Sequence, residues 1–305
     1  MFNEQIDRAI TQTELDTVFF QMFNQTSIPS FVTAEQGDLF KVINTTHSAY
    51  IQEVYGGTGL WSKTGETEQV SKSVPKVTNK MTTYIADFAD SVEISKNLFD
   101  DNMHGTYQKM VQDFALMGQT TRDANAFNVF NKAFTTSLTA DGAAAIATHT
   151  LISGGTYSNL VTGALSTTTL NTAITKMATM KNQAGVVIGC TPSILLVPPA
   201  LYMLASQIVG SPLQQGTPNN DINVFKMSYM IKVYTSPRLS ADAGGSDTAW
   251  FLIGSNHSVM RYVRQGVETA LRGWEFSDNR TYLYQANFRE EVAIIDYIGL
   301  VGSTG

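Results

Sequence analysis

The feature that most constrains this chain is a long polar stretch, residues 55–80, which separates two segments with strand-like alternation. The segments KVINTTHSAYIQEV and MTTYIADFADSVEI alternate apolar and polar side chains, as β-strands with one buried face do. The stretch between them is rich in Gly, Lys, Thr and Ser. A compact domain rarely contains so long a connection without regular structure unless the connection has a function. The sequence therefore predicts a two-stranded excursion with a mobile tip.

Such a hairpin extends beyond the body of its own domain. About 20 residues on each side, at roughly 3.3 Å per residue, reach on the order of 60 Å from the root, which exceeds the radius of a domain of this size. An isolated two-stranded ribbon is only marginally stable in water. We therefore expect the hairpin to lie on another surface.

Residues 57–64, within the hairpin loop, read GTGLWSKT and differ by one residue from the phosphate-binding pattern G-x-x-x-x-G-K-[ST]. Ser62 stands where the pattern requires a second glycine, and its side chain would crowd the backbone amides that approach phosphate. Gly65 follows at once, and the next residues have no helical periodicity, so no helix N-terminus is predicted there to receive phosphate. A nucleotide-dependent enzyme is the least favoured interpretation of this loop.

Composition narrows the function classes. The chain has 305 residues, of which 43% are hydrophobic and 15% charged, with a formal net charge of -6. A mildly acidic chain without a Lys/Arg-rich segment is a poor candidate for wrapping nucleic acid, whose binding depends on neutralising phosphates. Low charge content suits surfaces that are covered by copies of the same chain. The longest apolar run, residues 186–197, is too short and interrupted to span a bilayer, and no secretory signal is evident, so we expect an intracellular product without membrane contact.

No catalytic or metal site assembles from the sequence. The four histidines share no ligand spacing, the single cysteine, Cys190, sits in an apolar run, and no G-x-S-x-G elbow exists. Arg261, Arg264 and Arg272 form a modest basic cluster, for which a salt bridge between subunits is narrowly favoured over a phosphate contact. We therefore expect no enzymatic activity, no cofactor and no metal.

The N-terminal segment, residues 3–24, has loosely helical apolar spacing. Phe19 and Phe23 belong to its apolar face, which must dock either on the same subunit or on a neighbour. The sequence leaves both alternatives open.

The rest of the pattern predicts an α+β chain. A long helix is expected from Asp100 and Asp101, which offer an N-cap, to about Phe134, because apolar residues recur at helical spacing. After a loop-rich stretch, helices and strands alternate. The expected elements are a helix capped by Ser166 or Thr167, strands VVIG and SILLV, a helix ALYMLASQIVG, short strands at 230–234, 250–253 and 259–263, and two long strands, TYLYQANF and EVAIIDYIGLV.

This order of elements resembles the major capsid proteins of tailed bacteriophages, which have the Hong Kong 97-type fold. GTYQKMVQDFALMGQTTRDANAF is similar to the spine helix of that family, and SILLVPPALYMLASQI to its axial domain. In the C-terminal part, Gly254, Arg261, residues 276–279 and Arg289 occupy positions similar to the family's closing strands. The resemblance covers essentially the whole chain and extends to the Mu-like group of major head subunits, although each motif alone is weak.

The resemblance implies both a division of the chain and a function. The implied parts are an N-terminal arm (1–38), an extended hairpin called the E-loop (39–97), the first part of the P-domain with the spine helix (98–150), an α/β A-domain (151–265), and P-domain strands with the C-terminal return (266–305). The implied function is self-assembly into hexamers and pentamers of an icosahedral shell around double-stranded DNA, in the virion and, during assembly, in the host cytoplasm. DNA is expected to make only weak, non-specific contact, and scaffold, portal and decoration proteins are candidate partners.

In that family the E-loop lies across a neighbouring subunit. Trp61 is the strongest candidate anchor, because a tryptophan at a loop tip is either an anchor or an exposed liability. The full set of candidate intersubunit contacts is Trp61, Val70, Val74, Val77, Phe19, Phe23, Arg261 and Arg264.

Two features of some family members are not evident. The chain opens at Met1 and reaches the arm at once, so a scaffolding segment is expected as a separate protein or upstream of this sequence. Lys63 and the other loop lysines do not by themselves support the lysine–asparagine crosslink of some members. An encapsulin-like compartment shell, which packages enzymes, is the alternative within the same fold class, and the sequence alone separates it poorly from a phage shell. A structural appendage or surface protein is a further alternative, against which the missing secretory signal argues.

Overall fold

The computed structural model describes residues 2–24, 39–57, 59–70, 72, 77–101, 105–212, 222–274 and 279–305. The α-helices are α1 Phe2–Phe23, α2 Lys96–Asp101, α3 Thr106–Asn131, α4 Thr167–Ala178, α5 Tyr202–Gly210 and α6 Val224–Ser228. The strands are β1 Lys41–Asn44, β2 Ala49–Tyr55, β3 Val77–Tyr84, β4 Ala86–Ser95, β5 Thr148–Thr150, β6 Thr156–Ser158, β7 Leu160–Val161, β8 Pro192–Val197, β9 Lys232–Thr235, β10 Trp250–Gly254, β11 Val259–Arg272, β12 Thr281–Ile294 and β13 Leu300–Ser303. The expected α+β class is confirmed.

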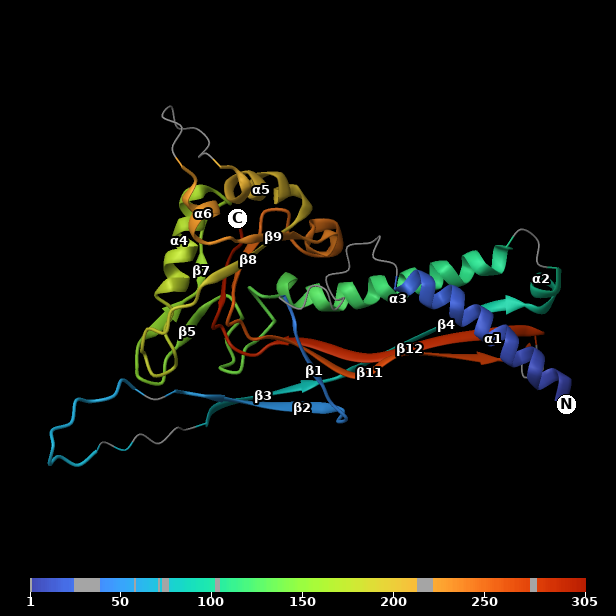
Figure 1. The fold of residues 1–305 in the computed structure, drawn as a ribbon, viewed down its shortest axis with the longest axis horizontal. Helices are drawn as coiled ribbons and strands as arrows, with labels where there is room; N and C mark the ends of the chain where they lie inside the picture. The colour runs from blue at the N-terminus through green and yellow to red at the C-terminus, as the bar shows by residue number, and fades with distance from the viewer. Residues whose placement is uncertain are drawn as a thin grey trace.

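A long four-stranded sheet, in the order β1-β11-β12-β4, runs beneath helix α3 (Figure 1). Its centre is the antiparallel pair β11–β12, in which Val259 lies opposite Ile294 and Arg272 opposite Leu283. Both strands have 14 residues, well beyond the usual strand length. The pair therefore connects the compact end of the molecule with the end that carries α1 and α2 (Figure 1).

The compact end is built on a second, five-stranded sheet in the order β7-β13-β10-β8-β9. Strand β10 reads WFLIG and all five of its residues are buried, as expected for a strand covered on both faces. Helix α4 begins with a capping box in which Ser166 and Thr169 each satisfy the other's backbone amide, so the predicted Ser166 cap is confirmed. Strand β13 lies inside this sheet, where Asn159 donates to the carbonyl of Leu300 at 3.0 Å.

Helix α1 docks on its own subunit. Phe19 and Phe23 are buried against α3 and the long sheet. Asp16 accepts hydrogen bonds from the hydroxyls of Thr269 and Tyr284, both at 2.7 Å, and so ties α1 to β11 and β12. Of the two docking alternatives, the structure shows the one within the subunit.

The two segments that were predicted as single strands are each divided between two sheets. In the first, β1 pairs in parallel with β11, whereas β2 pairs with β3. In the second, Ile85 separates β3 from β4, and β4 pairs with β12. In both segments apolar and polar residues keep alternating across the break between the two strands, so the alternation alone did not reveal the breaks.

Three further expectations were wrong in detail. The long helix begins after Gly105, whose φ of 65° is left-handed, and Asp100 and Asp101 lie in the separate helix α2. The VVIG segment forms only an isolated bridge through Val187. TYLYQANF and EVAIIDYIGLV, which were expected as two long strands, form one long strand, β12, followed by the short β13, and Glu290 lies within β12.

Glu290 stays in the strand because its charge is neutralised there. Its carboxylate, which is almost fully buried, accepts from the guanidinium of Arg261 at 2.5 Å and from that of Arg122 at 3.3 Å. Burial lowers the pKa of Arg261, and the carboxylate opposes that effect. Strands β11 and β12 and helix α3 thus meet at one buried ionic cluster.

The variant Glu290→Gln is expected to destabilise the unassembled subunit by about 3–5 kcal/mol, because it leaves two guanidinium groups without their buried counter-charge. Glu268→Gln, an exposed position on β11, is the matched control and should change the free energy of unfolding by less than about 0.5 kcal/mol. Chemical denaturation measures both. Equal, small effects of the two variants would show that the ionic cluster contributes little.

Candidate assembly surfaces

The strands of the hairpin β2–β3 pack on the body of the subunit: Tyr50, Val54 and Met81 pack against the cluster around Tyr262, and Gly57, just beyond β2, lies beside Asn182. The hydroxyl of Tyr262 on β11 donates to the side-chain carbonyl of Gln52 at 2.7 Å, and the ring of Tyr50 lies 4.8 Å from that of Tyr262. A cross-strand ion pair joins Lys80 and Glu53 at 2.7 Å. The loop that joins the two strands projects away from the body (Figure 1).

The loop of the hairpin exposes large apolar side chains. Trp61 is 94% exposed and Leu60 is 84% exposed, and Val70 and Val77 are also exposed. Val74 lies outside the described residues. An apolar side chain left in water at this extent favours burial against a partner, because roughly 25 cal/mol is gained per Å² of apolar surface removed from water.

The phosphate-loop resemblance does not hold in three dimensions. After Thr64 the described residues form a turn, in which the amide of Gly65 donates to Glu68 at 3.0 Å, and no helix begins in residues 65–70 or 72. A phosphate-binding loop needs a following helix whose amides point at the anion. Within the described part of this loop that requirement is not met.

A second apolar surface lies on the compact end and was missed from the sequence. Met203 of α5 is 69% exposed and Met230, just after α6, is 82% exposed; Tyr202 and Leu204 are exposed beside Met203. Helix α5 reads YMLASQIVG and contains no charge, and a helix apolar on most sides is normally buried. The uncharged, apolar sequence of α5 was the signal from which this exposed surface could have been predicted.

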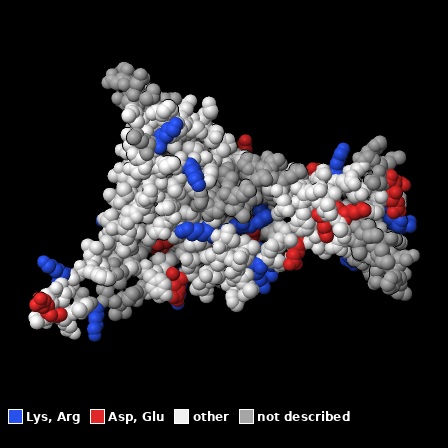
Figure 2. All heavy atoms as spheres, in the orientation of Figure 1, with Lys and Arg blue, Asp and Glu red and all other residues white. Residues whose placement is uncertain are grey.

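Charge is distributed unevenly over the molecule. On the face shown in Figure 2, acidic and basic side chains both lie at the hairpin tip, acidic side chains gather at the end that carries α1 and α2, and the body between them carries scattered, mostly basic side chains on a largely uncharged surface. Surfaces poor in charge are typical of the centres of protein interfaces. The uncharged parts of the body therefore fit contacts between subunits.

The arginine candidates are not brought together as one cluster. Arg261 is buried and forms its ion pair with Glu290 of its own subunit. Arg264 is half-buried on the same strand. Phe19 and Phe23, as described above, contribute to the subunit's own core.

Among the described residues, no group of three or more His, Cys, Asp or Glu side chains is arranged to hold a metal ion. No helix among them combines the length and apolar character needed to cross a membrane.

A family model identifies the class of protein to which these exposed surfaces belong. The family model described as "Phage capsid protein" matches residues 78–302, which is most of the chain. The chain belongs to this family. It is a major capsid protein, a subunit of a viral shell, and the hairpin and the long helix are parts of a capsid fold. No curated protein matches the capsid protein in sequence.

Solved structures show the same fold at low sequence identity. The mature capsid of bacteriophage PhiM1 is 11% identical, with a TM-score of 0.58 over 88% of this chain and 86% of that chain. The capsid of the native GTA particle is 12% identical, with a TM-score of 0.58 over 92% and 93%. The holo-SrpI encapsulin complex from Synechococcus elongatus PCC 7942 is 10% identical, with a TM-score of 0.55 over 91% and 89%. The Hong Kong 97-type fold is thereby confirmed for this capsid protein.

The capsid protein also contains a cluster of titratable groups next to β5. The imidazole Nδ1 of His149 lies 2.7 Å from the carboxylate of Asp141, and the His149 ring stacks on Tyr297 with centroids 4.3 Å apart. Burial favours the neutral form of Asp141, but hydrogen bonds from His149 and Thr139 outweigh it and lower the pKa to about 2. Burial raises the pKa of the nearby Asp296 to about 6, despite the backbone amide of Tyr297 that it accepts.

The raised pKa of Asp296 predicts a pH dependence of stability. The folded subunit binds this proton more tightly than the unfolded chain does, so the contribution of Asp296 to stability falls as the pH rises from about 4 to about 6. Asp296→Asn keeps the acceptor for the Tyr297 amide without the charge. The variant should be more stable than the parent near neutral pH by about 1–2 kcal/mol, and the difference should close below about pH 4.

Denaturation of the unassembled subunit across this pH range tests the prediction. Asp242→Asn, at an exposed position, is the control and should show no such pH-dependent gain. A shift of the Asp296→Asn variant that is the same at every pH would contradict the assignment.

Proposed function

We propose that this capsid protein assembles into hexamers and pentamers of an icosahedral shell around double-stranded DNA, and that the E-loop hairpin of each subunit lies across its neighbour. The observation that carries the proposal is the exposed pair Leu60 and Trp61 in the loop of a hairpin whose strands pack on the body but whose loop projects from it (Figure 1). Contact with a neighbouring subunit removes these apolar side chains from water.

The proposal also assigns each segment of the chain to a part of the capsid subunit. We propose an N-terminal arm (1–38), the E-loop (39–97), P-domain segments (98–150 and 266–305) and an A-domain (151–265) that gathers at the capsomer axis. The apolar surface around Met203 and Met230 belongs to the A-domain and fits a contact near that axis. Strand β13 pairs with β10 and β7, so the C-terminal return passes through the sheet of the A-domain.

The proposed role is structural rather than enzymatic. A net charge of -6 favours weak, non-specific contact with packaged DNA. Assembly is placed in the host cytoplasm, with scaffold, portal and decoration proteins as partners. The family model favours a phage shell over the encapsulin-like alternative, because it describes phage capsid proteins and matches most of the chain.

The anchor role of Trp61 is tested by Trp61→Ala. The folded subunit should be unaffected, because Trp61 is almost fully exposed within it. Shell formation should fall, since a buried interface tryptophan is typically worth 2 kcal/mol or more. Electron microscopy and sedimentation measure shell yield, and Thr67→Ala, also exposed in the loop, is the control. Parent-like shell yield from Trp61→Ala would remove Trp61 from the assembly contact.

The hairpin as a whole is tested by shortening it. Replacing residues 56–76 by Asn-Gly joins β2 to β3 by a two-residue turn at the point where Tyr55 pairs with Val77. The shortened subunit should fold with an unchanged melting temperature and fail to form stable shells. Normal shells from this variant would contradict a bridging E-loop.

A further inference from the structure

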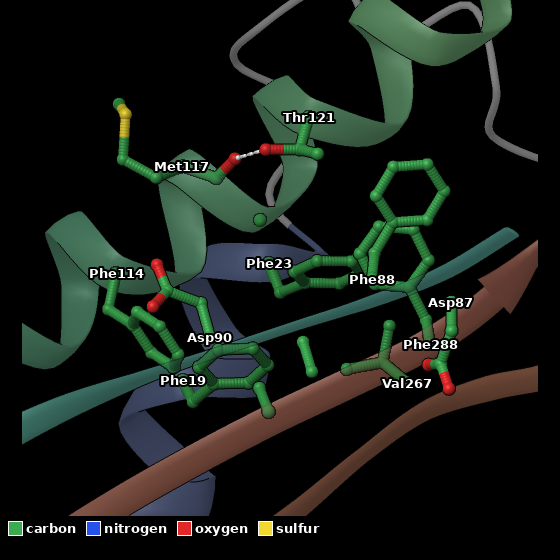
Figure 3. A pocket seen from close by; sticks show the side chains of 13 residues that line it. Phe19, Phe23, Asp87, Phe88, Asp90, Phe114, Met117, Thr121, Val267 and Phe288 are labelled. Carbon is green, nitrogen blue, oxygen red and sulfur yellow. Dashed lines mark hydrogen bonds between the residues drawn. The ribbon is translucent and has the colours of Figure 1, made fainter.

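A hollow of about 300 Å³ lies between the hairpin and the compact end of the subunit. Asn79 of β3 lines it on the hairpin side, and β5, its flanking loops and Gln183 line it on the other. Another hollow, of about 310 Å³ and lined largely by phenylalanines, lies beneath α1 (Figure 3), at the opposite end of the molecule from the hairpin loop (Figure 1). Of these two hollows, the loop of the same subunit can reach only the first.

The hollow beside β3 is lined by a residue with an unpaired acceptor. Gln183 is 3% exposed, and its side-chain oxygen has no hydrogen-bond partner among the described residues. Asp141 also lines the hollow, but its carboxylate already accepts from the Thr139 hydroxyl and lies 2.7 Å from Nδ1 of His149. An unpaired buried acceptor is costly, so the entry of a group with an N–H donor is favoured.

Exposed apolar side chains border the same hollow. Ile152, which lines it, is 63% exposed, and Val187 and Ile188 are exposed as well. The loops that carry these side chains adjoin each other, because the Ile152 amide donates to the Gln183 carbonyl at 3.1 Å and Lys181 forms a bridge with Val187. An apolar group that docks here removes these side chains from water together with itself.

The hairpin loop begins beside this hollow. Gly57, just beyond β2, approaches Asn182 so closely that a Cβ added to Gly57 would meet the side-chain nitrogen of Asn182 at 2.9 Å. Gly57 also has a φ of 74°, which favours glycine. Asn182 directly precedes Gln183, so one end of the loop is held next to the residue with the unpaired oxygen.

Leu60 and Trp61 are within reach of the hollow. Trp61 follows Gly57 by four residues, and an extended chain of that length spans up to about 14 Å. Its indole combines a large apolar ring with one N–H donor, which is the chemistry that the hollow and its unpaired acceptor require. A tryptophan that is 94% exposed gains more from burial than any smaller side chain of the loop.

We propose that in the unassembled subunit the hairpin loop folds back, so that Trp61 enters this hollow and donates to Gln183 while Leu60 covers Ile152. This docked form is in equilibrium with the extended form that the structure shows. Docking hides the most exposed apolar residues of the loop before assembly and so limits indiscriminate association. The inference rests on the proposed function in one respect, because the same Trp61 must leave the hollow before it contacts a neighbour.

Disulfide trapping tests the docked position. Ser62→Cys with Thr150→Cys places one thiol next to Trp61 and the other on the wall of the hollow, both at exposed positions. The only native cysteine, Cys190, is buried. Mild oxidation of the unassembled subunit should give a bond within one chain, at a rate independent of protein concentration. Docking raises the local concentration of the two thiols, so the bond should form at least about tenfold faster than for Ser62→Cys with Asp113→Cys on α3.

The role of Trp61 is tested with the same pair of cysteines. Trp61→Ala should slow bond formation about fivefold or more, because the ring that holds the loop in the hollow is lost. Trp61→Phe keeps a ring without the N–H and should lie between, whereas Thr67→Ala, exposed in the same loop, should have no effect. A rate unchanged by Trp61→Ala would overturn the proposal. Bonds that form only between chains would assign the hollow to a neighbouring subunit and overturn it as well.

Assembly of the trapped subunit separates this inference from the proposed function. The oxidised pair should give about tenfold fewer shells than the reduced pair by electron microscopy, because Trp61 is held away from the neighbour, and reductant should restore them. If the Trp61-dependent bond forms but oxidised subunits assemble normally, the docking stands and the bridging E-loop is contradicted. If no such bond forms while the shortened hairpin abolishes shells, the bridging E-loop stands and the docking is wrong.

Discussion

The architecture depends on one buried carboxylate between two guanidinium groups. Glu290 on β12 joins Arg261 on β11 to Arg122 on α3, near the point where the long strand pair leaves the compact end of the molecule. Breaking a buried ion pair costs more than forming it gains, because the remaining charge is left in a poorly solvating interior. The cluster therefore acts mainly by disfavouring other arrangements of β11, β12 and α3. It fixes the position of α3 along the long sheet.

A shell subunit needs a rigid body and a weakly attached arm. The rigid part is the long sheet with α3 above it, tied to α1 by Asp16. The arm is the hairpin, held at its root by Tyr262 and Gln52. In the proposed assembly Leu60 and Trp61 of the arm make their contacts outside the subunit, so that association is reversible without unfolding the body.

The sequence was informative where the signal was local. The hairpin was predicted because its loop is polar over a length that compact domains seldom contain, and the Ser166 cap because its partner is three residues away. The ionic cluster around Glu290 was not predicted, because the two partners of Glu290 lie 168 and 29 residues away, beyond any local pattern. The division of the predicted strands between two sheets was missed for a related reason: alternation reports which face is buried, but not which strand lies beside it.

For the candidate contact residues, too, exposure or burial was predictable only where it depends on the local sequence. The exposure of Trp61 follows from its place in a polar loop and was expected, whereas the burial of Phe19 and Phe23 depends on α3 and β12, which are far away in the sequence. The surface around Met203 and Met230 was overlooked because an apolar helix looks the same in sequence whether its outer side meets the core or another subunit.

The position of β13 has a consequence for how the subunit is made. Residues 300–303 lie between β7 and β10, inside the five-stranded sheet, and Gly302 donates to the backbone carbonyl of Asn159 at 3.2 Å. Until these residues have left the ribosome, β10 has an unpaired edge and the sheet cannot close. Chains that stop short of residue 300 lack the strand that pairs with both β7 and β10, so this sheet is completed only after nearly the whole chain has been synthesised.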